Sequence, residues 1–327
     1  MKRLEEIQRI VETHIEAEIE ALNIREPKHL YAPIAYALGN GGKRFRPRLL
    51  LMAMEMFSQL TPQGLDAALA VEVFHNFTLL HDDIMDDADL RRGKDTVHKK
   101  FNPNTAILSG DAMMISSYNY FKGLAPDLRA KVLDIFTQTA LEVCEGQQYD
   151  MDFENQSDVE VGAYIEMIRL KTAVLLAASM KIGAIIGGAN EVNANLVYDF
   201  GIKVGISFQI QDDILDVYGN PETFGKEVGG DIVSNKKTIL MLQAMRDAKG
   251  DELDKLNEWL SKEVFDREEK IAAITSIYDK LNVRQKAEAI QQSYFDQALE
   301  SLDQISVSVE RKQPLRTVAI SLLRRDV

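Results

Sequence analysis

Two groups of aspartates have the residue type and the spacing that suit a divalent metal ion. The pattern Asp-Asp-x-x-Asp occurs at Asp82–Asp86 and again at Asp212–Asp216. On a helix, the first and last aspartates of this pattern lie one turn apart on the same face. Like charges at that spacing cost roughly 0.2–0.5 kcal/mol per pair, so a bound cation would explain why the pattern occurs twice. Because carboxylate oxygens favour Mg²⁺, whose shell is usually completed by water and substrate phosphates, the sequence predicts an enzyme that acts on a diphosphate held by Mg²⁺ between two facing helices.

Basic residues that could bind phosphate lie just after the first motif and in an upstream loop. Arg91 and Arg92 follow the motif, and a guanidinium matches phosphate oxygens in a bidentate way. Plain salt bridges to the aspartates are the alternative. The loop Gly41–Pro47 combines glycines, which let the backbone approach an anion, with the charges of Lys43 and Arg46. These residues predict phosphate sites in an otherwise acidic protein.

Composition narrows the classes of partner. The chain of 327 residues has a formal net charge of −13 and a hydrophobic share of 46%, which allows a large core. The negative charge argues against nucleic acid and against electrostatic attachment to an anionic membrane. A single cysteine, Cys144, excludes an intrachain disulfide and favours a reducing compartment. The first residues have the pattern of an amphipathic helix rather than of a targeting peptide, so we expect a cytoplasmic protein without a membrane span.

Helical periodicity dominates the segments that must carry these residues. Apolar residues recur every three or four positions over Leu4–Leu22, and short breakers such as Thr61–Pro62 and Asn102–Pro103 separate the periodic segments. The apolar stretch Ala173–Ala189 contains a lysine and several glycines, so a buried helix explains it better than a membrane span. No alternation of β-branched residues predicts a strand pair. We therefore predict an all-α fold in which residues 1–327 form one domain, a bundle of about ten or more helices.

The order of the motifs resembles that of the trans-isoprenyl diphosphate synthases, the head-to-tail prenyltransferases. The segments that carry the resemblance span nearly the whole chain: GGKRFRP, HDDIMDDADLRRG, SGDA, the pair Lys171–Thr172, FQIQDDILD, FGKEVGGD and NKKT. The resemblance implies an all-α homodimer with a deep central cavity and a cluster of three Mg²⁺ ions, for which Mn²⁺ can substitute. It implies two substrates, isopentenyl diphosphate and an allylic diphosphate (dimethylallyl, geranyl or farnesyl diphosphate).

The resemblance also implies roles for individual residues. The metal ligands would be Asp82, Asp86 and Asp212, supported by Asp83, Asp213 and Asp216. The allylic diphosphate would be bound by Arg91, Lys171 and Lys226, and isopentenyl diphosphate by Lys43, Arg46, His75 and Arg92. Thr172 and Gln209, together with Lys171, would line the path of the allylic cation. The segment Gly225–Lys237 would close over the substrate, so that Lys226, Asp231 and Lys236 act in the closed state.

His75 has an alternative role, because a lone histidine among apolar residues is more often a satisfied core group. Its position seven residues before Asp82, almost two helical turns, places it on the same face as the motif. That alignment and the resemblance both favour the site.

Product length would depend on residues one to two turns before the first motif, which the resemblance implies to be the wall of the cavity. Phe77 and Thr78 stand five and four residues before Asp82, and Phe74 lies a further turn away. One aromatic residue at the fifth position with a small residue at the fourth resembles the geranylgeranyl type. We therefore predict a C20 product, with C15 farnesyl diphosphate as the alternative, and ordinary core packing as the alternative role of Phe77. Weaker candidates for the far wall are Met113, Met114 and Tyr118.

The implied chemistry is ionisation, condensation and elimination, and other protein classes fit the motifs less well. A class I terpene cyclase shares one aspartate motif, but its second metal motif is of an Asn/Ser/Glu type and it needs no isopentenyl diphosphate site. A head-to-head synthase would have different aspartate motifs, and a non-catalytic subunit would have lost motif residues. An acidic scaffold does not explain Lys171 and Lys226. Arg324 and Arg325 would either close over the site or end a helix, where cations suit the dipole.

Overall fold

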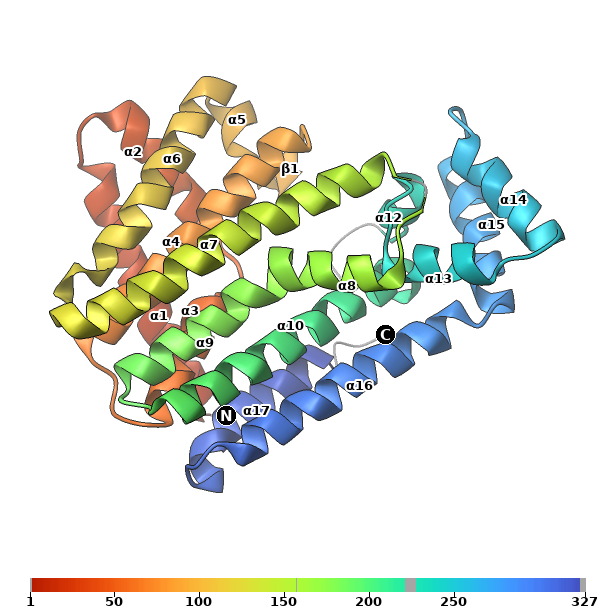
Figure 1. Cartoon of the computed structure of the whole chain (residues 1–327). Helices are drawn as coiled ribbons and strands as arrows, with labels where there is room; N and C mark the ends of the chain where they lie inside the picture. The colour runs from red at the N-terminus through yellow and green to blue at the C-terminus, as the bar shows by residue number, and fades with distance from the viewer. Residues whose placement is uncertain (1, 157, 221–227, 324–327) are drawn as a thin grey trace. The chain divides into compact units, whose positions relative to one another are not determined.

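The computed structural model describes residues 2–156, 158–220 and 228–323, which are almost entirely helical, as Figure 1 shows. The all-α prediction is confirmed. Contacts divide the chain into two compact units, each assembled from segments far apart in the sequence. The first unit comprises residues 1–138, 178–198 and 305–315, and the second comprises residues 139–177, 199–304 and 316–327. Four of the five boundaries fall within helices, namely α7 (Pro126–Glu154), α9 (Val174–Ile186), α10 (Glu191–Tyr218) and α17 (Val309–Leu323), and the fifth lies between residues 304 and 305. A single domain over residues 1–327 stays a prediction.

The first unit contains the helices that precede and follow the first aspartate motif. Its further elements are α1 (Lys2–Asn23), α2 (Lys28–Gly39), α3 (Phe45–Glu55), α4 (Pro62–Met85), α5 (Val97–Lys100), α6 (Pro103–Asn119) and the 3₁₀-helix η1 (Tyr120–Gly123). The predicted breakers do begin helices, because proline suits the first turn and the preceding side chain caps it. The Thr61 hydroxyl accepts a hydrogen bond from the backbone of Gly64 at 3.2 Å, and the Asn102 amide oxygen accepts one from Thr105 at 2.8 Å.

The core of the first unit is built around α3 and α4. All residues of Leu49–Met54 on α3 are buried. The first unit's part of α9 packs against α3 through Gly183, and Gly187, just after α9, does the same. An added Cβ atom on either glycine would overlap a backbone carbonyl of α3. Close helix packing therefore explains the glycines in the apolar stretch around α9, and the prediction of a buried helix there is confirmed.

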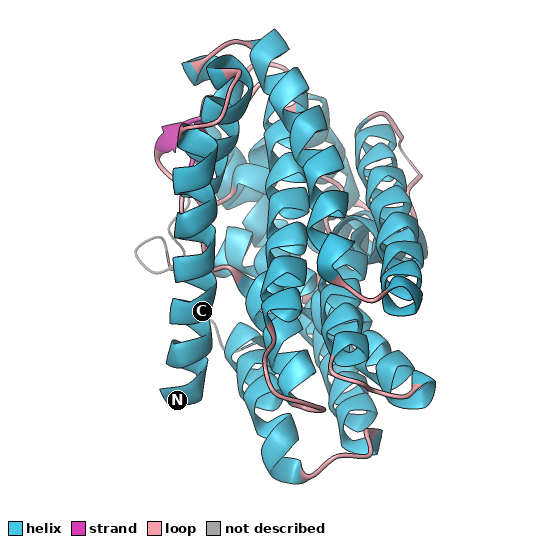
Figure 2. Cartoon of the chain, turned by 90° about the vertical axis from the view of Figure 1, so that its left-hand side faces the viewer, coloured by secondary structure: helices cyan, strands magenta, loops and turns pink. Residues whose placement is uncertain are grey.

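A short hairpin follows α4 and corrects the expectation that the chain has no strand pair. Strands β1 (Leu90–Arg91) and β2 (Lys94–Asp95), magenta in Figure 2, pair in antiparallel fashion. Arg92 and Gly93 between them both have positive φ angles, 55° and 73°, as the tight turns of two-residue hairpins require. The strands are too short and too polar to show alternation, so only the turn could have indicated them.

The second unit carries the second aspartate motif on α10. Its further elements are α8 (Val161–Ile168), the π-helix η2 (Arg169–Ala173), α12 (Gly230–Val233), α13 (Ile239–Asp247), α14 (Asp251–Ser261), α15 (Arg267–Lys280) and α16 (Val283–Gln304). Buried apolar side chains from α8, α10, α13, α15 and α16 form one cluster that includes Tyr164, Ile210, Ile239 and Ile274. Among the helices of the described residues, none has the length and apolarity needed to cross a membrane.

Candidate active site

The aspartates of the first motif lie at the C-terminal end of α4 and differ in exposure. Asp83 is buried, Asp82 is partly buried and Asp86, the residue after the helix, is exposed. Arg91 of the hairpin donates from Nε to Oδ1 of Asp83 at 2.7 Å, and its Nη2 lies 3.7 Å from Oδ2 of Asp82. The carboxylate of Asp83 is thus paired with Arg91, while the carboxylates of Asp82 and Asp86 are more accessible to solvent.

The second arginine of the hairpin connects it to the glycine loop. Arg92 donates from Nη1 to the carbonyl oxygen of Gly41. Gly42 has a φ of 123°, and a Cβ atom there would overlap the guanidinium of Arg92. The loop and the hairpin are therefore in contact, and glycine is needed at position 42 both for its backbone conformation and for space.

Arg44 anchors the basic loop, although sequence reasoning gave it no role. It is buried and in the left-handed backbone region, with a φ of 47°. Its guanidinium donates to the carboxylate of Glu72 and to the carbonyl oxygen of Leu38. Asn76 also donates to Glu72 Oε1, at 3.0 Å. This buried ion pair fixes the loop to α4, while Lys43 stays exposed.

Arg46 and His75 are brought together as the sequence predicts for a shared phosphate site. Nη1 of Arg46 lies 3.1 Å from Nε2 of His75. A guanidinium can only donate, so Nε2 accepts and the histidine is neutral. Burial is the main cause that lowers the pKa of His75 well below its ordinary value, and the charges of four arginines (Arg46, Arg92, Arg91 and Arg44) add to it. Burial likewise lowers the pKa of Arg46, to about 10.

The three residues predicted to control product length lie on α4 in the first unit. Phe77 is buried and packs edge-on against His81, with ring centroids 4.8 Å apart, and against Phe74 at 5.4 Å. Phe74 in turn contacts Phe136 of α7, at 5.2 Å. Thr78 uses its hydroxyl to donate to the carbonyl of His75 at 2.8 Å. Phe74 and Phe77 are thus both packed in an aromatic cluster, and the cavity-wall role of Phe77, Thr78 and Phe74 stays a prediction.

Of the weaker wall candidates, two have defined surroundings. Tyr118 joins the aromatic cluster of the first unit, with its ring centroid 5.0 Å from that of Phe136. Met113 is fully buried, in keeping with core packing.

In the second unit, Lys171 and Thr172 lie on the π-helix η2, between α8 and α9. Single π-turns inside helices are rare and frequently mark functional sites. Two glycines make room for this turn. A Cβ atom on Gly146 of α7 would overlap the backbone of Lys171, and one on Gly205 of α10 would lie 2.6 Å from Ala173. The π-turn therefore positions Lys171 and Thr172 between two closely packed helices of its own unit.

Asp150 of α7 is a site residue that sequence reasoning missed. Its Oδ2 accepts a hydrogen bond from Nζ of Lys171 at 2.6 Å. Burial raises the pKa of Asp150, but the charges of Lys236 and Lys171 outweigh it and hold this pKa below its ordinary value. Asp150 is thus hydrogen-bonded to Lys171 and influenced by the charge of Lys236, the two being lysines predicted to bind substrate. Asp150 is one of several acidic residues on α7 and belongs to no motif, so the sequence offered no signal for it.

The second motif has its own buried aspartate, Asp213. Tyr164 of α8 donates its hydroxyl proton to Oδ2, and Gln209 donates to Oδ1 at 3.3 Å. Gln209 also accepts from the hydroxyl of Thr172 at 3.2 Å. Burial, with the nearby charge of Asp231, raises the pKa of Asp213 to about 7. A chain of hydrogen bonds therefore links the motif to Thr172.

The carboxylates fit a hard divalent cation held partly by substrate. Asp212 and Asp216 are partly buried, whereas the oxygens of Asp213 already accept hydrogen bonds from the protein. Asp216 accepts from the backbone nitrogen of Asp231 at 3.0 Å. Within residues 2–156, 158–220 and 228–323, no three or more histidine, cysteine or acidic side chains are grouped to hold a metal. Mg²⁺ prefers carboxylate oxygens and completes its shell with phosphates and water, so aspartates of this kind suit that ion.

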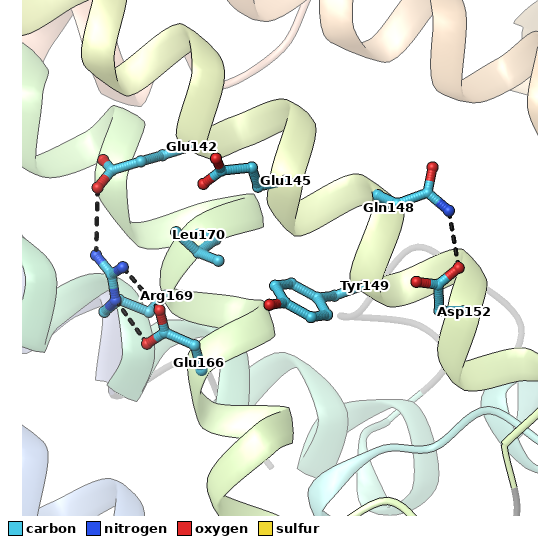
Figure 3. Close-up of a pocket in the computed structure, with 8 residues that line it drawn as sticks. All are labelled: Glu142, Glu145, Gln148, Tyr149, Asp152, Glu166, Arg169 and Leu170. Atoms are coloured by element: carbon cyan, nitrogen blue, oxygen red, sulfur yellow. Dashed lines mark hydrogen bonds and ion pairs between the residues drawn. The ribbon is translucent and has the colours of Figure 1, made fainter.

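Three predicted residues, Lys226, Arg324 and Arg325, lie outside the described residues. A further pocket in the second unit, of about 510 Å³, contains none of the predicted site residues. Figure 3 shows its lining of carboxylates around Arg169, which approaches Glu142 at 3.9 Å and pairs with Glu166 at 2.8 Å. Through Arg169, these ion pairs connect α7 to α8. The charged side chains that line the pocket therefore have a structural role.

Comparison with known proteins identifies relatives over most of the chain. Residues 27–278 match the family model described as polyprenyl synthetase. A geranylfarnesyl diphosphate synthase from Natronomonas pharaonis is 40% identical over 247 residues, which cover 70% of this chain and 72% of that protein. The crystal structure of a geranylgeranyl pyrophosphate synthase is 44% identical, with a TM-score of 0.92, and the match covers 98% of this chain and 99% of that one. The geranylgeranyl pyrophosphate synthase of Corynebacterium glutamicum, complexed with isoprenyl diphosphate and magnesium, is 27% identical, with a TM-score of 0.85 over 99% of this chain and 98% of that one.

Proposed function

The chain belongs to the polyprenyl synthetase family and is a trans-prenyltransferase, and we propose that it condenses isopentenyl diphosphate with an allylic diphosphate to give geranylgeranyl diphosphate. The observation that carries this proposal is the end of α4, where the arginine-rich hairpin and the glycine loop meet the first aspartate motif. Metal-binding and phosphate-binding groups thus occur together in one unit. The family match favours a condensing enzyme over the class I terpene cyclase.

Isopentenyl diphosphate is assigned to the basic residues of the first unit. Lys43 and Arg92 are exposed, and Arg46 is held against His75. A neutral His75 leaves the charge of Arg46 undiminished, so that the arginine can bind a phosphate oxygen. Arg44 would not touch the substrate, because its guanidinium is already occupied by Glu72 and Leu38.

The allylic diphosphate is assigned to Arg91, Lys171 and Lys236, with Lys226 as predicted from the sequence. Asp150 is hydrogen-bonded to Lys171, and the charge of Lys236 acts on the same carboxylate, so we assign one anionic ligand to both lysines. We propose that the aspartates of both motifs act on this diphosphate. Mg²⁺, bound by Asp82, Asp86 and Asp212, would stabilise the charge that develops on the departing diphosphate.

The chain's own residues would then guide three steps. The bond between C1 and the diphosphate oxygen of the allylic substrate breaks, and the lysines and Arg91 bind the released anion. The double bond of isopentenyl diphosphate attacks C1 of the allylic cation, near the oxygen dipoles of Thr172 and Gln209. A proton then leaves C2 of the isopentenyl unit, with the released diphosphate as the acceptor, and the new double bond forms. Apolar side chains must exclude water while the cation exists.

The C20 product rests on Phe77 and on the relatives described above. Phe77 is held in place by His81 and Phe74, which would make it a firm floor for the growing chain. The relatives include one protein named for a C20 product at 44% identity and one named for a C25 product at 40%. We therefore propose geranylgeranyl diphosphate as the main product.

The test is to incubate the purified protein with Mg²⁺, labelled isopentenyl diphosphate and each allylic starter in turn, then dephosphorylate the products and measure their chain length. A single C20 alcohol is the expected result. A C15 or C25 alcohol would retain the prenyltransferase and overturn the product assignment. Failure to condense with every starter would overturn the function itself.

We also propose that the protein works as a homodimer. In the single chain, α6 exposes Ile107 by 45%, Leu108 by 60% and Ile115 by 67%. Positions seven and eight residues apart lie on one face of a helix, so these side chains form an apolar stripe. Exposed apolar stripes of this kind mark surfaces that bind a partner, and a second copy of the chain is the partner we assign.

A further inference from the structure

Lys270 of α15 is a fully buried lysine whose ammonium group contacts two oxygens and one aromatic ring. Its Nζ donates to the carbonyl oxygen of Val233 at 3.1 Å and to the amide oxygen of Asn235 at 2.7 Å. The same nitrogen lies 4.1 Å from the ring centroid of Phe265. Among the described residues, no carboxylate is paired with this ammonium. Both hydrogen bonds of the ammonium group therefore go to one turn, the one that contains Val233 and Asn235.

A buried ammonium without a carboxylate is costly, since burial disfavours its charged form. Burial accordingly lowers the pKa of Lys270. Charge-assisted hydrogen bonds and the face of an aromatic ring offset part of that cost. An apolar residue at this position of α15 would avoid the cost of burying a charge. The contacts with Val233 and Asn235 therefore indicate that the ammonium group has a specific role.

The turn that Lys270 holds leads directly to Lys236. Asn235 has a left-handed φ of 56°, and its side-chain amide donates to the carbonyl of Leu260 at 3.1 Å. The backbone nitrogen of Lys236 donates to the carbonyl of Asp231 at 2.9 Å. Val233 and Asn235 are thus bonded to the α14–α15 segment, and Lys236 is bonded back to α12. Lys236 is the lysine whose charge acts on Asp150.

We propose that Lys270 is a positioning residue that fixes the turn Val233–Lys236 and thereby places Lys236 for the allylic diphosphate. The proposal rests on the proposed function, because it assigns to Lys236 the role described above. Lys270 itself is buried and touches no substrate. It acts through the backbone of the turn, which it holds by the carbonyl of one residue and the side chain of another.

The test compares steady-state kinetics of three variants with the wild type. Lys270→Met keeps the length of the side chain and removes its donors, and we expect the KM for the allylic diphosphate to rise about three- to tenfold. The KM for isopentenyl diphosphate should stay within about twofold of the wild type. Asn235→Gly keeps the left-handed backbone and removes the amide that accepts from Lys270 and donates to Leu260, so it should change the same constant in the same direction. Lys280→Met, on the exposed face of the same helix, is the matched control and should change neither constant.

A double mutant separates positioning from general destabilisation. If Lys270 acts through Lys236, then adding Lys270→Met to Lys236→Met should raise the allylic KM no further, because the two substitutions remove one interaction. The proposal would be overturned if the effects of the two substitutions on the allylic KM multiplied in the double mutant. It would also be overturned if Lys270→Met raised both KM values equally. Should Lys270→Met not fold, Asn235→Gly carries the same comparison in the same double mutant. A wild type that fails to condense the substrates would instead overturn the proposed function.

Discussion

The backbone nitrogen of Lys171 lies 2.2 Å from the position that the Cβ atom of an alanine at position 146 would take. Gly146 is buried on α7, and Lys171 lies on the π-turn that interrupts the helix from α8 to α9. The glycine thus allows a backbone approach that any side chain would prevent. Nζ of Lys171 is bound to Asp150, which is also on α7. Helix α7 therefore contacts both the backbone and the ammonium group of Lys171.

Gly146→Ala is therefore expected to push the π-turn away from α7. Overpacking of this kind costs about 1–3 kcal/mol of unfolding free energy, and displacement of Lys171 should also raise the KM for the allylic diphosphate. The matched control is Gly162→Ala on α8 in the same unit, where an added Cβ atom meets nothing within 4 Å. That control should be neutral or stabilise the protein by up to about 1 kcal/mol. Equal effects of the two alanines in denaturant titration would contradict the packing argument.

The neutral state of His75 beside Arg46 predicts how stability depends on pH. An unfolded chain protonates histidine near pH 6.5, whereas the pKa of folded His75 is well below that value. Below about pH 6.5 the unfolded state thus binds more protons, and stability falls as the pH falls. His75→Gln should remove this contribution and give a shallower loss of unfolding free energy between about pH 7.5 and about pH 5.5. His29→Gln, at an exposed position of α2, controls for the loss of one histidine, and parallel curves for wild type and His75→Gln would refute the prediction.

Asp213 predicts the opposite pH dependence. Burial and Asp231 raise its folded pKa to about 7, while an unfolded aspartate titrates near 3.9. Between these values the folded state binds more protons, so the contribution of Asp213 to stability decreases as the pH rises through that window. Asp213→Asn should raise the melting temperature of the metal-free protein at about pH 8, with a much smaller gain at about pH 5. The same variant should lose prenyltransferase activity, and a melting temperature that falls at both pH values would contradict the assignment.

The sequence indicated the candidate site residues better than the groups that hold them. Arg46, Thr172 and Gln209 belong to motifs, and His75 lies almost two helical turns before one. The structure brings Arg46 into contact with His75, and Thr172 into contact with Gln209. Asp150, Tyr164 and Lys270 carry no motif. Their contacts join positions far apart in the chain, which local spacing does not reveal.

The helices could be predicted because their signals are local. Proline after a capping residue marks the start of α4 and of α6. The hairpin around Arg92 has only two residues in each strand, too few for a pattern, and the π-turn at Lys171 results from packing against Gly146 and Gly205. Both irregular elements carry predicted site residues, so local patterns are least informative where the proposed chemistry takes place.

Phe77→Ala should lengthen the products. Removing the ring from above the first motif would open space along α4, and the main product should shift from C20 to C25 or longer chains in the chain-length assay. Loss of a buried phenylalanine also costs about 3–5 kcal/mol, so a control with a similar loss is needed. Phe121→Ala removes another buried ring of the first unit, one that packs on Phe136 and lies outside α4. It should destabilise the protein without changing product length, and an unchanged product distribution for Phe77→Ala would exclude the floor role.

Ile115→Glu should break the proposed homodimer. The side chain is 67% exposed in the single chain, so a charge there costs the isolated protomer little. At an interface with a second copy, however, two-fold symmetry would bring two buried glutamates onto the apolar stripe, each without a partner. Light scattering after size-exclusion chromatography should show a dimer for the wild type and a monomer of unchanged helicity for the variant. Val192→Glu is the matched control, since Val192 is 69% exposed at the start of α10 and lies outside the stripe. If both variants remain dimers, the stripe on α6 is not the interface, and if the wild type is itself a monomer, the homodimer is wrong.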